Sequence, residues 1–279
     1  MTMRTILTAL AGAVLAASAV PAAADQHEPS TQDRAALAAA IANANRAEDQ
    51  ARDAFRHPAE TLAFFGVEPG MKVGEYAPGG GWYSRVLGNY LNGEGQLVGL
   101  YFTPENGVFD EEARAGIRQG AATFPARVAE WTGRAAEGTA GLTLDAVTEA
   151  DKGTFDRVLV IRMMHNMMRM NFADSELKAM RDLLKPDGML GIVQHRAKDD
   201  APGDYANGSK GYLREKDVIG FVEAQGFELV EKSEINANPR DPADHAEGVW
   251  EMPPTLRTQR AELRDLGESD RMTLLFRKR

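Results

Sequence analysis

The chain has 279 residues, no cysteine and a formal net charge of −9. The lack of cysteine excludes disulfides, thiolate metal sites and cysteine nucleophiles. Its pI near 5.2, with Lys and Arg scattered along the chain, argues against a nucleic-acid partner, whose binding surface normally carries a basic stripe. A mean hydropathy of −0.37 and 43% hydrophobic residues are typical of a globular protein with an ample core.

The first 24 residues differ in composition from the rest. Arg4 is followed by an apolar run at 6–20, which ends at Pro21-Ala-Ala-Ala24. This order is typical of a secretory signal, and we expect cleavage after Ala24. The run is shorter than the roughly 20 apolar residues of a transmembrane helix. We therefore expect a periplasmic or secreted protein with no stable membrane insertion after signal cleavage.

Residues 25–66 are predicted to form an N-terminal linker and helices. The alanine-rich stretch 34–53 predicts one moderately amphipathic helix, and 59–65 predicts a second, shorter one after His57-Pro58. We expect this region to act as a lid or brace on the main domain, residues 67–279.

Strands and helices are predicted to alternate from residue 67 onward, and no internal repeat interrupts them. The expected strands are 71–76, 96–102, 142–147, 155–161, 189–194, 227–232 and 272–277. The expected helices are 82–91, a segment around 110–119, one that Asp174 caps, and 216–225. This alternation predicts an α/β domain with a mainly parallel sheet.

A glycine-rich loop follows the first of these strands. Glu75 ends the strand, Pro78-Gly-Gly-Gly81 follows, and a helix is predicted from Trp82. Glycines let a ligand approach the backbone closely, and the start of a helix offers unpaired N–H groups. The same pattern also occurs in tight strand-to-helix turns that bind no ligand.

The order of these motifs resembles a class I S-adenosylmethionine-dependent methyltransferase. That family's first motif, D/E-x-G-x-G-x-G, appears here as Glu75-Tyr-Ala77-Pro-Gly79-Gly-Gly81. Phe155-Asp-Arg-Val resembles its fourth strand, and Leu184-Lys-Pro-Asp-Gly188 resembles its turn into the fifth. The glycine loop, His165-Asn166 and His195-Arg-Ala197 look like a bacterial branch of predicted, exported methyltransferases. The resemblance covers roughly residues 46–279.

The resemblance implies a Rossmann-like methyltransferase fold, a seven-stranded and mostly parallel sheet with an antiparallel last strand and helices on both faces. The cofactor, S-adenosylmethionine, would lie over the carboxyl ends of the first strands. Its implied or possible contacts are Glu75, Ala77, Gly79, Gly80, Gly81, Tyr83, Tyr101 and Glu105.

One departure concerns the acid that the family usually carries after its second strand, where it binds the ribose. This chain has Gly99-Leu-Tyr101-Phe-Thr there, and the nearest acid is Glu105. Either Glu105 folds back, or Tyr101 and Thr103 replace the acid, or nucleoside binding is lost.

Two histidines are predicted to lie near each other. His165 and His195 each follow a central strand, and the ends of neighbouring strands place side chains within about 5–8 Å. A neutral histidine suits the removal of a proton from a methyl acceptor, while Asn166 and Arg162 could orient the acceptor's oxygen or carboxylate. Each histidine could equally hydrogen-bond to backbone at its strand end. No close ligand spacing supports a metal site that also uses His245, so none is expected.

Other aromatic and sulfur-containing residues leave alternatives open. Trp82 and Tyr83 could flank the sulfonium or the acceptor, whereas Trp131 and Trp250 are expected to pack in the interior. The methionines between 163 and 170 favour packing under the following helix over lining a substrate pocket.

The sequence therefore predicts an exported S-adenosylmethionine-dependent methyltransferase that acts on an unidentified small molecule. The alternative is a periplasmic binding or assembly protein with this fold and no methyl transfer activity, because fold does not fix function. A metal-dependent hydrolase or lyase is a third hypothesis. The oligomeric state stays open.

Overall fold

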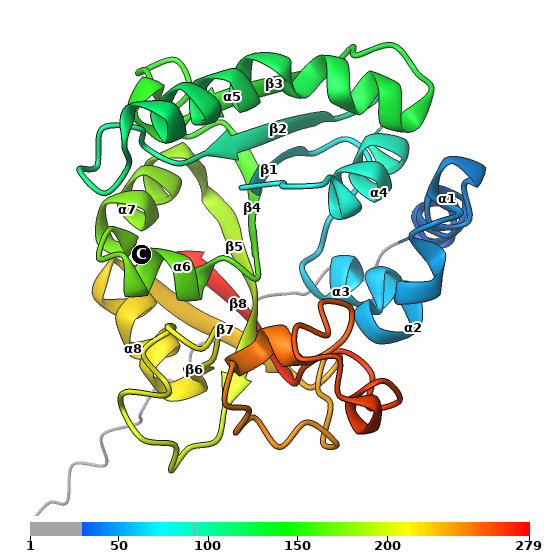
Figure 1. Ribbon diagram of the computed structural model, residues 1–279. Helices are drawn as coiled ribbons and strands as arrows, with labels where there is room; N and C mark the ends of the chain where they lie inside the picture. The colour runs from blue at the N-terminus through cyan, green and yellow to red at the C-terminus, as the bar shows by residue number, and fades with distance from the viewer. Residues whose placement is uncertain (1–29, 92) are drawn as a thin grey trace, which may run out of the picture.

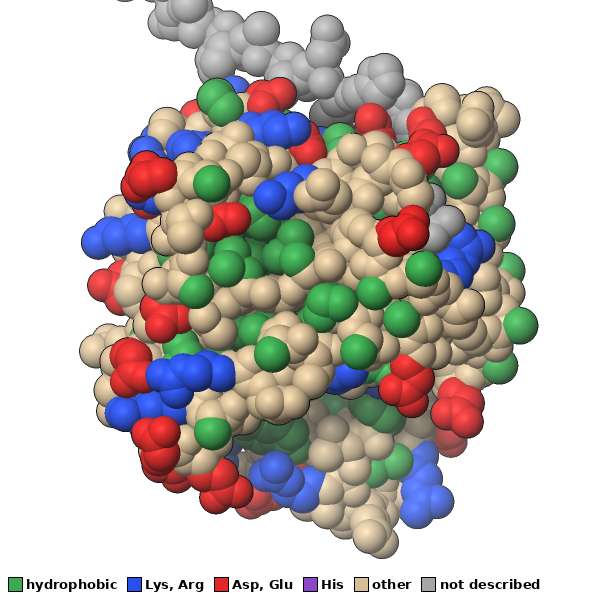
Figure 2. Space-filling model, turned by 90° about the horizontal axis from the view of Figure 1, so that it is seen from above, with side chains coloured by type: hydrophobic (Ala, Val, Ile, Leu, Met, Phe, Trp, Pro, Cys, Tyr) green, Lys and Arg blue, Asp and Glu red, His purple; other side chains and the backbone are tan. Residues whose placement is uncertain are grey.

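The computed structural model describes residues 30–91 and 93–279. The predicted signal peptide lies outside these ranges. A twisted sheet runs through the molecule, and helices flank it (Figure 1). No helix in the described ranges is long and apolar enough to cross a membrane. Basic and acidic side chains intermingle on the face seen from above, without a continuous basic stripe (Figure 2).

The sheet confirms the predicted fold class. Its strand order is β3-β2-β1-β4-β5-β8-β7, with a short β6 paired beside β5. The strands are β1 (Lys72–Tyr76), β2 (Gln96–Tyr101), β3 (Thr139–Thr143), β4 (Phe155–Ile161), β5 (Leu184–Ala197), β6 (Leu213–Arg214), β7 (Phe227–Ser233) and β8 (Arg271–Lys278). Only β8 runs antiparallel to its sheet neighbours, β5 and β7. The two-residue β6 is an addition to the seven strands expected.

Helices cover both faces of the sheet, as predicted. One apolar core holds side chains of α1 (Thr31–Ile41), α3 (Pro58–Phe64), α4 (Trp82–Tyr90) and α5 (Glu111–Thr132). The other core holds side chains of α6 (Met164–Arg169), α7 (Ala173–Leu183) and α8 (Glu215–Ala224). Met164 and Met167 are fully buried in this second core, which agrees with the packing interpretation of the methionines.

The single helix predicted at 34–53 is wrong. α1 ends at Ile41, and two 3₁₀ turns at Ala44–Arg46 and Gln50–Arg52 lead into α2 (Asp53–Arg56). The buried Arg46 guanidinium donates to the Ile41 carbonyl and to the Asp53 carboxylate. Because Arg46 satisfies the carbonyl at the end of α1, the chain can turn there, an effect of one side chain that alanine content does not reveal.

Three other boundaries also differ from prediction. α5 extends to Thr132 and contains Pro125, so it is much longer than the segment expected around 110–119. β3 begins at Thr139 and a 3₁₀ turn follows it, which moves this strand toward the N-terminus. Asp174 is not the cap of α7, because Phe172 occupies that position and Asp174 lies in the first turn. An acid in the first turn still interacts favourably with the positive end of the helix dipole.

Candidate functional site

A cavity of about 310 Å³ opens at the carboxyl ends of β1 and β4. Ligands of open α/β sheets bind at this end of the strands. The predicted cofactor residues Glu75, Ala77, Gly79, Gly80 and Tyr83 line it, together with Arg162. The remaining wall is formed by Asp49, Arg52, Arg56, Tyr76, Pro78, Trp82, Arg85, Ile161 and Met163. We call this space the glycine-loop cavity.

The glycine loop has a left-handed backbone at three places. Ala77, Gly79 and Gly81 have φ values of 49°, 57° and 76°. A Cβ atom on Gly81 would come within 2.3 Å of the Trp131 ring, whereas one on Gly80 would meet nothing within 4 Å. Gly81 is therefore required by the close approach of Trp131, and Gly80 is open toward the cavity.

Glu75 is an acid held in an apolar setting. Its side chain is buried, with 4% of its surface exposed, and Ser84 Oγ donates a hydrogen bond of 2.5 Å to Oε2. Burial raises the pKa of Glu75 to about 8, against the opposing effects of Ser84, Arg85 and Arg127. The carboxyl group consequently carries a proton at neutral pH, and a cationic ligand group beside it would favour its ionisation.

The end of β2 is organised differently from the family pattern. Tyr101 is buried and packs edge-on against Phe124 of α5, and Glu105 pairs with Arg114 and Arg118. Neither Tyr101 nor Glu105 lines the glycine-loop cavity.

The buried Glu176 of α7 ties the ends of β1 and β2 together. It accepts hydrogen bonds from Tyr76 Oη at 2.7 Å and from the Thr103 backbone N–H at 2.9 Å. A carboxylate thus lies near the end of β2, but it comes from a helix and both its oxygens are already bonded. Sequence position alone does not predict this arrangement.

A second cavity of about 180 Å³ adjoins the first. It contains all four predicted catalytic residues, since Arg162, His165, Asn166 and His195 lie in its wall. The rest of the wall is formed by Met163, Val249, Trp250, Pro253, Pro254, Thr255, Glu268 and Ser269. Arg162 and Met163 line both cavities. We call this second space the histidine cavity.

The two histidines lie side by side with their ring centroids 5.7 Å apart. His195 Nδ1 is 2.6 Å from Ser269 Oγ, and His165 Nδ1 is 3.3 Å from Gln194 Oε1. Because a carbonyl oxygen only accepts, this contact assigns the proton of His165 to Nδ1 and leaves Nε2 with a lone pair.

Burial keeps both imidazoles neutral. It lowers the pKa of His165 to about 4, although the hydrogen bond to Gln194 opposes it and Arg162 adds to it. Burial also lowers the pKa of His195 well below its ordinary value, and Arg162 lowers it further. Neutral imidazoles can accept a proton from a ligand.

Arginines surround the boundary between the cavities. Glu268, 5% exposed, accepts from Arg52 at 2.7 Å and from Arg56 and Arg271 at 3.1 Å. Burial alone would raise the pKa of Glu268, but Arg56, Arg271 and Arg52 hold it below its ordinary value. One ionised carboxylate is thus shared by three guanidinium groups.

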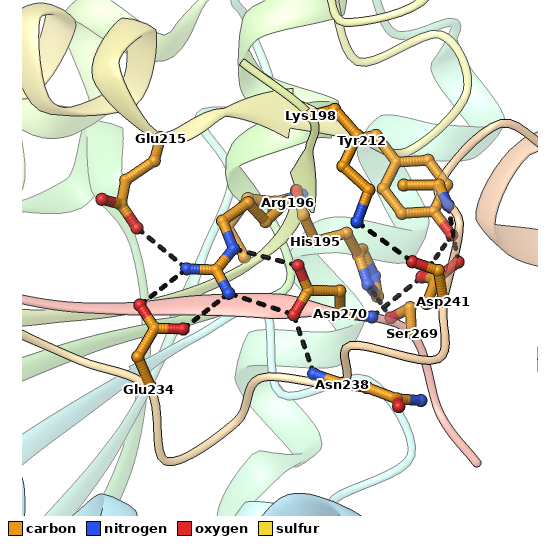
Figure 3. A network of polar contacts seen from close by, with 12 residues as sticks. His195, Arg196, Lys198, Tyr212, Glu215, Glu234, Asn238, Asp241, Ser269 and Asp270 are labelled. Atoms are coloured by element: carbon orange, nitrogen blue, oxygen red, sulfur yellow. Dashed lines mark hydrogen bonds and ion pairs between the residues drawn. The ribbon is translucent and has the colours of Figure 1, made fainter. Parts of the chain in front are cut away.

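A polar network behind His195 fixes its strand (Figure 3). Asp270 pairs with Arg196 at 3.0 Å. Asp241 accepts from Tyr212 Oη at 2.8 Å and contacts His245 Nε2 at 3.0 Å. His245 is therefore bonded within this network, and no group of three or more metal-ligating side chains occurs in residues 30–91 and 93–279.

Several wall residues were not predicted from the sequence. Arg52 and Arg56 come from the N-terminal helices, and Trp250, Glu268 and Ser269 come from the irregular segment between β7 and β8. Trp250 was expected to be packing, yet it lies over His165 with ring centroids 6.3 Å apart. No local motif marks these residues, because their places depend on contacts with distant strands.

Solved structures with the same fold support the assignment of fold class. The chain is similar to a geranyl diphosphate methyltransferase in complex with SAM, with a TM-score of 0.52 and 12% identity over 87% of this chain and 95% of that one. It is also similar to the [4+2]-cyclase SpnF, with a TM-score of 0.51 and 18% identity over 85% of both chains. The chain matches no family model. No curated protein matches it. The fold is that of S-adenosylmethionine-dependent methyltransferases.

Proposed function

We propose that the chain is an exported S-adenosylmethionine-dependent methyltransferase acting on a small molecule. The observation that carries this proposal is the junction of two cavities at Arg162 and Met163. Methyl transfer requires two ligands whose reacting atoms are held in contact, since orientation supplies much of the rate enhancement. Adjoining cavities at the carboxyl ends of β1, β4 and β5 meet that requirement.

The glycine-loop cavity fits the amino-acid end of the methyl donor. Glu75 offers a buried carboxyl group for an ammonium group, and Gly80 leaves room beside the backbone. When bound, the donor supplies an electrophilic methyl group on a sulfonium. At the nucleoside end, neither Tyr101 nor Glu105 offers the acid that the family uses for the ribose. Hence we propose that backbone groups and the loop after β1 hold most of the donor.

The histidine cavity fits the acceptor. A neutral His165 with its Nε2 lone pair can take the proton that an acceptor hydroxyl or amine loses on methylation. His195, held by Ser269, is the second candidate for this proton. Asn166 lines the same cavity, but its Oδ1 accepts from Arg169 at 3.0 Å and its Nδ2 donates to Met163 Sδ at 3.7 Å, so the second N–H of Nδ2 is the part available to an acceptor.

The proposed export rests on the sequence. The apolar run at 6–20 and Pro21-Ala-Ala-Ala24 are typical of a cleaved signal. An exported methyltransferase needs a donor outside the cytoplasm, so donor binding by the protein that begins at Asp25 is the first property to measure.

Calorimetry with S-adenosylhomocysteine, the demethylated donor, tests this function. Gly80→Arg should fill the glycine-loop cavity and weaken binding at least about 100-fold, which corresponds to about 2.7 kcal/mol. Gly70→Arg is the matched control, because Gly70 is exposed and a side chain there meets nothing within 4 Å. No binding to the unsubstituted protein at millimolar concentration would rule out the proposed function.

The second candidate is a binding or assembly protein that uses the same cavities without methyl transfer. Two observations favour it, the bonded Glu176 near the end of β2 and the similarity to the [4+2]-cyclase SpnF. A native mass spectrum that shows a co-purified ligand other than the donor would support it. Methylation of a small molecule at a steady rate would eliminate it.

A further inference from the structure

Arg162 has a feature that the proposed reaction does not explain. It follows β4 with a left-handed φ of 60°, and its backbone N–H donates to the Val193 carbonyl at 2.6 Å. Its side chain lines both cavities. Within the described ranges its guanidinium group interacts with the charge of Glu268, but no hydrogen bond or ion pair joins it to another residue. A guanidinium group is always charged and offers five donors, so an unbonded one in a cavity calls for a ligand.

The carboxylates around Arg162 are already occupied. Glu268, the only acid in the wall of the histidine cavity, serves Arg52, Arg56 and Arg271. Asp49, in the wall of the glycine-loop cavity, pairs with Arg85. Positive charge is therefore in excess at the boundary between the cavities.

Acids on the other side of His195 do not balance this charge. Asp270 is paired with Arg196, and Asp241 accepts from Tyr212 and contacts His245, as Figure 3 shows for the labelled residues. Neither acid lines either cavity. The neutral histidines contribute no negative charge either. An anionic ligand would offset the excess, and charge-assisted hydrogen bonds to arginine are the strong class of such contacts.

We propose that the histidine cavity binds an acceptor that carries a carboxylate, which lies against the Arg162 guanidinium and presents its nucleophilic atom to His165 and His195. That the bound molecule is a methyl acceptor rests on the proposed function, whereas the carboxylate site does not. Guanidinium and carboxylate groups match in a planar, bidentate geometry. A cavity of about 180 Å³ is smaller than typical drug-sized pockets of roughly 300–1,000 Å³, so the acceptor, or its reacting end, is small.

The test uses acetate and acetamide, which share a shape and differ in charge. Each is titrated at constant ionic strength into the protein while the imidazole proton signals are recorded by NMR, with His165→Gln and His195→Gln used for assignment. Acetate should move the signals of both histidines in a saturable way, and acetamide should not.

Substitutions of Arg162 test whether acetate binds against this side chain. Arg162→Gln should raise the acetate midpoint roughly tenfold or more, because it removes the charged donor of the carboxylate, and Arg162→Lys should restore part of the response. Arg118→Gln is the control, because Arg118 is half-exposed, pairs with Glu105 and lines neither cavity. It removes one arginine charge and should leave the midpoint unchanged.

Saturating S-adenosylhomocysteine separates the two sources of a carboxylate. An acetate response that persists in its presence supports an acceptor site. If the donor product abolishes the response and Arg162→Gln weakens its binding, Arg162 holds the donor's own carboxylate and the proposal is overturned. It is also overturned if acetate has no effect on the unsubstituted protein. If S-adenosylhomocysteine does not bind but the acetate response stands, the methyltransferase assignment fails and the carboxylate site survives.

Discussion

The two cavities are built in different ways and present different titratable groups. The glycine-loop cavity takes much of its wall from one continuous stretch, 75–85, whereas the histidine cavity assembles residues from 162–166, 195, 249–255 and 268–269. The first presents a carboxyl group that burial keeps protonated. The second presents an unbonded guanidinium group and two neutral imidazoles. Arg162 lies in the wall of both cavities, and Arg52, Arg56 and Arg85 also line the first, so the cavities differ in the buried carboxyl group of one and the two imidazoles of the other.

Glu268 stands where the two cavities meet, and its loss should have the largest effect. Glu268→Gln would leave Arg56 and Arg271 buried beside Arg162 without a negative partner. Removing one member of a buried charged cluster typically costs about 3–5 kcal/mol. Chemical denaturation should show a fall of this order in the free energy of unfolding.

Glu234→Gln is the control for that substitution. Glu234 pairs with Arg196 at 2.7 Å, but its side chain is 64% exposed, and exposed pairs contribute about 0–1 kcal/mol. Equal effects of the two substitutions would contradict the view that Glu268 holds the boundary between the cavities together.

Glu75 should make the stability of the protein sensitive to pH near neutrality. Its pKa is raised from 4.5 to about 8 in the folded protein, so between these values the folded state binds a proton that the unfolded state has lost. Above pH ~6.5 the free energy of unfolding should therefore fall as pH rises, by at most about 1.4 kcal/mol per pH unit. Below that pH the lowered pKa values of His165 and His195 act in the opposite direction, because the unfolded state binds protons that the folded imidazoles do not. Glu75→Gln should remove this slope.

The affinity for S-adenosylhomocysteine should rise with pH, whereas the free energy of unfolding falls. Since the ionised Glu75 attracts the ammonium group of S-adenosylhomocysteine, affinity should increase between pH 6 and 8, by at most about tenfold per unit. Glu75→Gln should have a flat profile over this range. An unchanged slope in the variant, measured by calorimetry, would mean that another group controls binding.

Gly81→Ala should lower the free energy of unfolding by less than Glu268→Gln does. Its Cβ would press into the Trp131 ring, and its φ of 76° is unfavourable for alanine. We expect a loss of about 1–3 kcal/mol, the usual range for overpacking. Gly80→Ala, where a Cβ meets nothing within 4 Å, should be close to neutral in the same denaturation experiment.

Most of the fold, and the grouping of several candidate site residues, could be predicted from the sequence. The strands and the glycine loop follow from local patterns, namely apolar runs, the three glycines and the acid Glu75. The equivalent placement of His165 and His195 follows from strand order, and the structure puts their rings 5.7 Å apart. These features could be predicted because they follow from local sequence patterns and from the order of the strands.

The remainder depended on contacts between distant segments. Glu268 accepts from Arg56 across 212 positions of the chain. Trp250 and Ser269 belong to an irregular segment whose position no periodic pattern reveals. The lack of an acid after β2 was visible in the sequence, but the carboxylate that Glu176 brings there from α7 was not.

Ser269→Ala should have the smallest effect and should act on the histidine cavity alone. The substitution removes the 2.6 Å contact with His195 Nδ1, and a typical hydrogen bond contributes about 0.5–1.5 kcal/mol to stability. Nitrogen NMR of the imidazole should show a changed tautomer balance at His195, because Ser269 no longer orients Nδ1. Binding of S-adenosylhomocysteine should not change, since Ser269 does not line the glycine-loop cavity. Ser175→Ala, which removes a hydrogen bond of 2.9 Å to the Phe172 carbonyl, should lower stability comparably and leave the His195 signals in place. A matching loss of donor-product affinity in Ser269→Ala would show instead that the two cavities respond as one site.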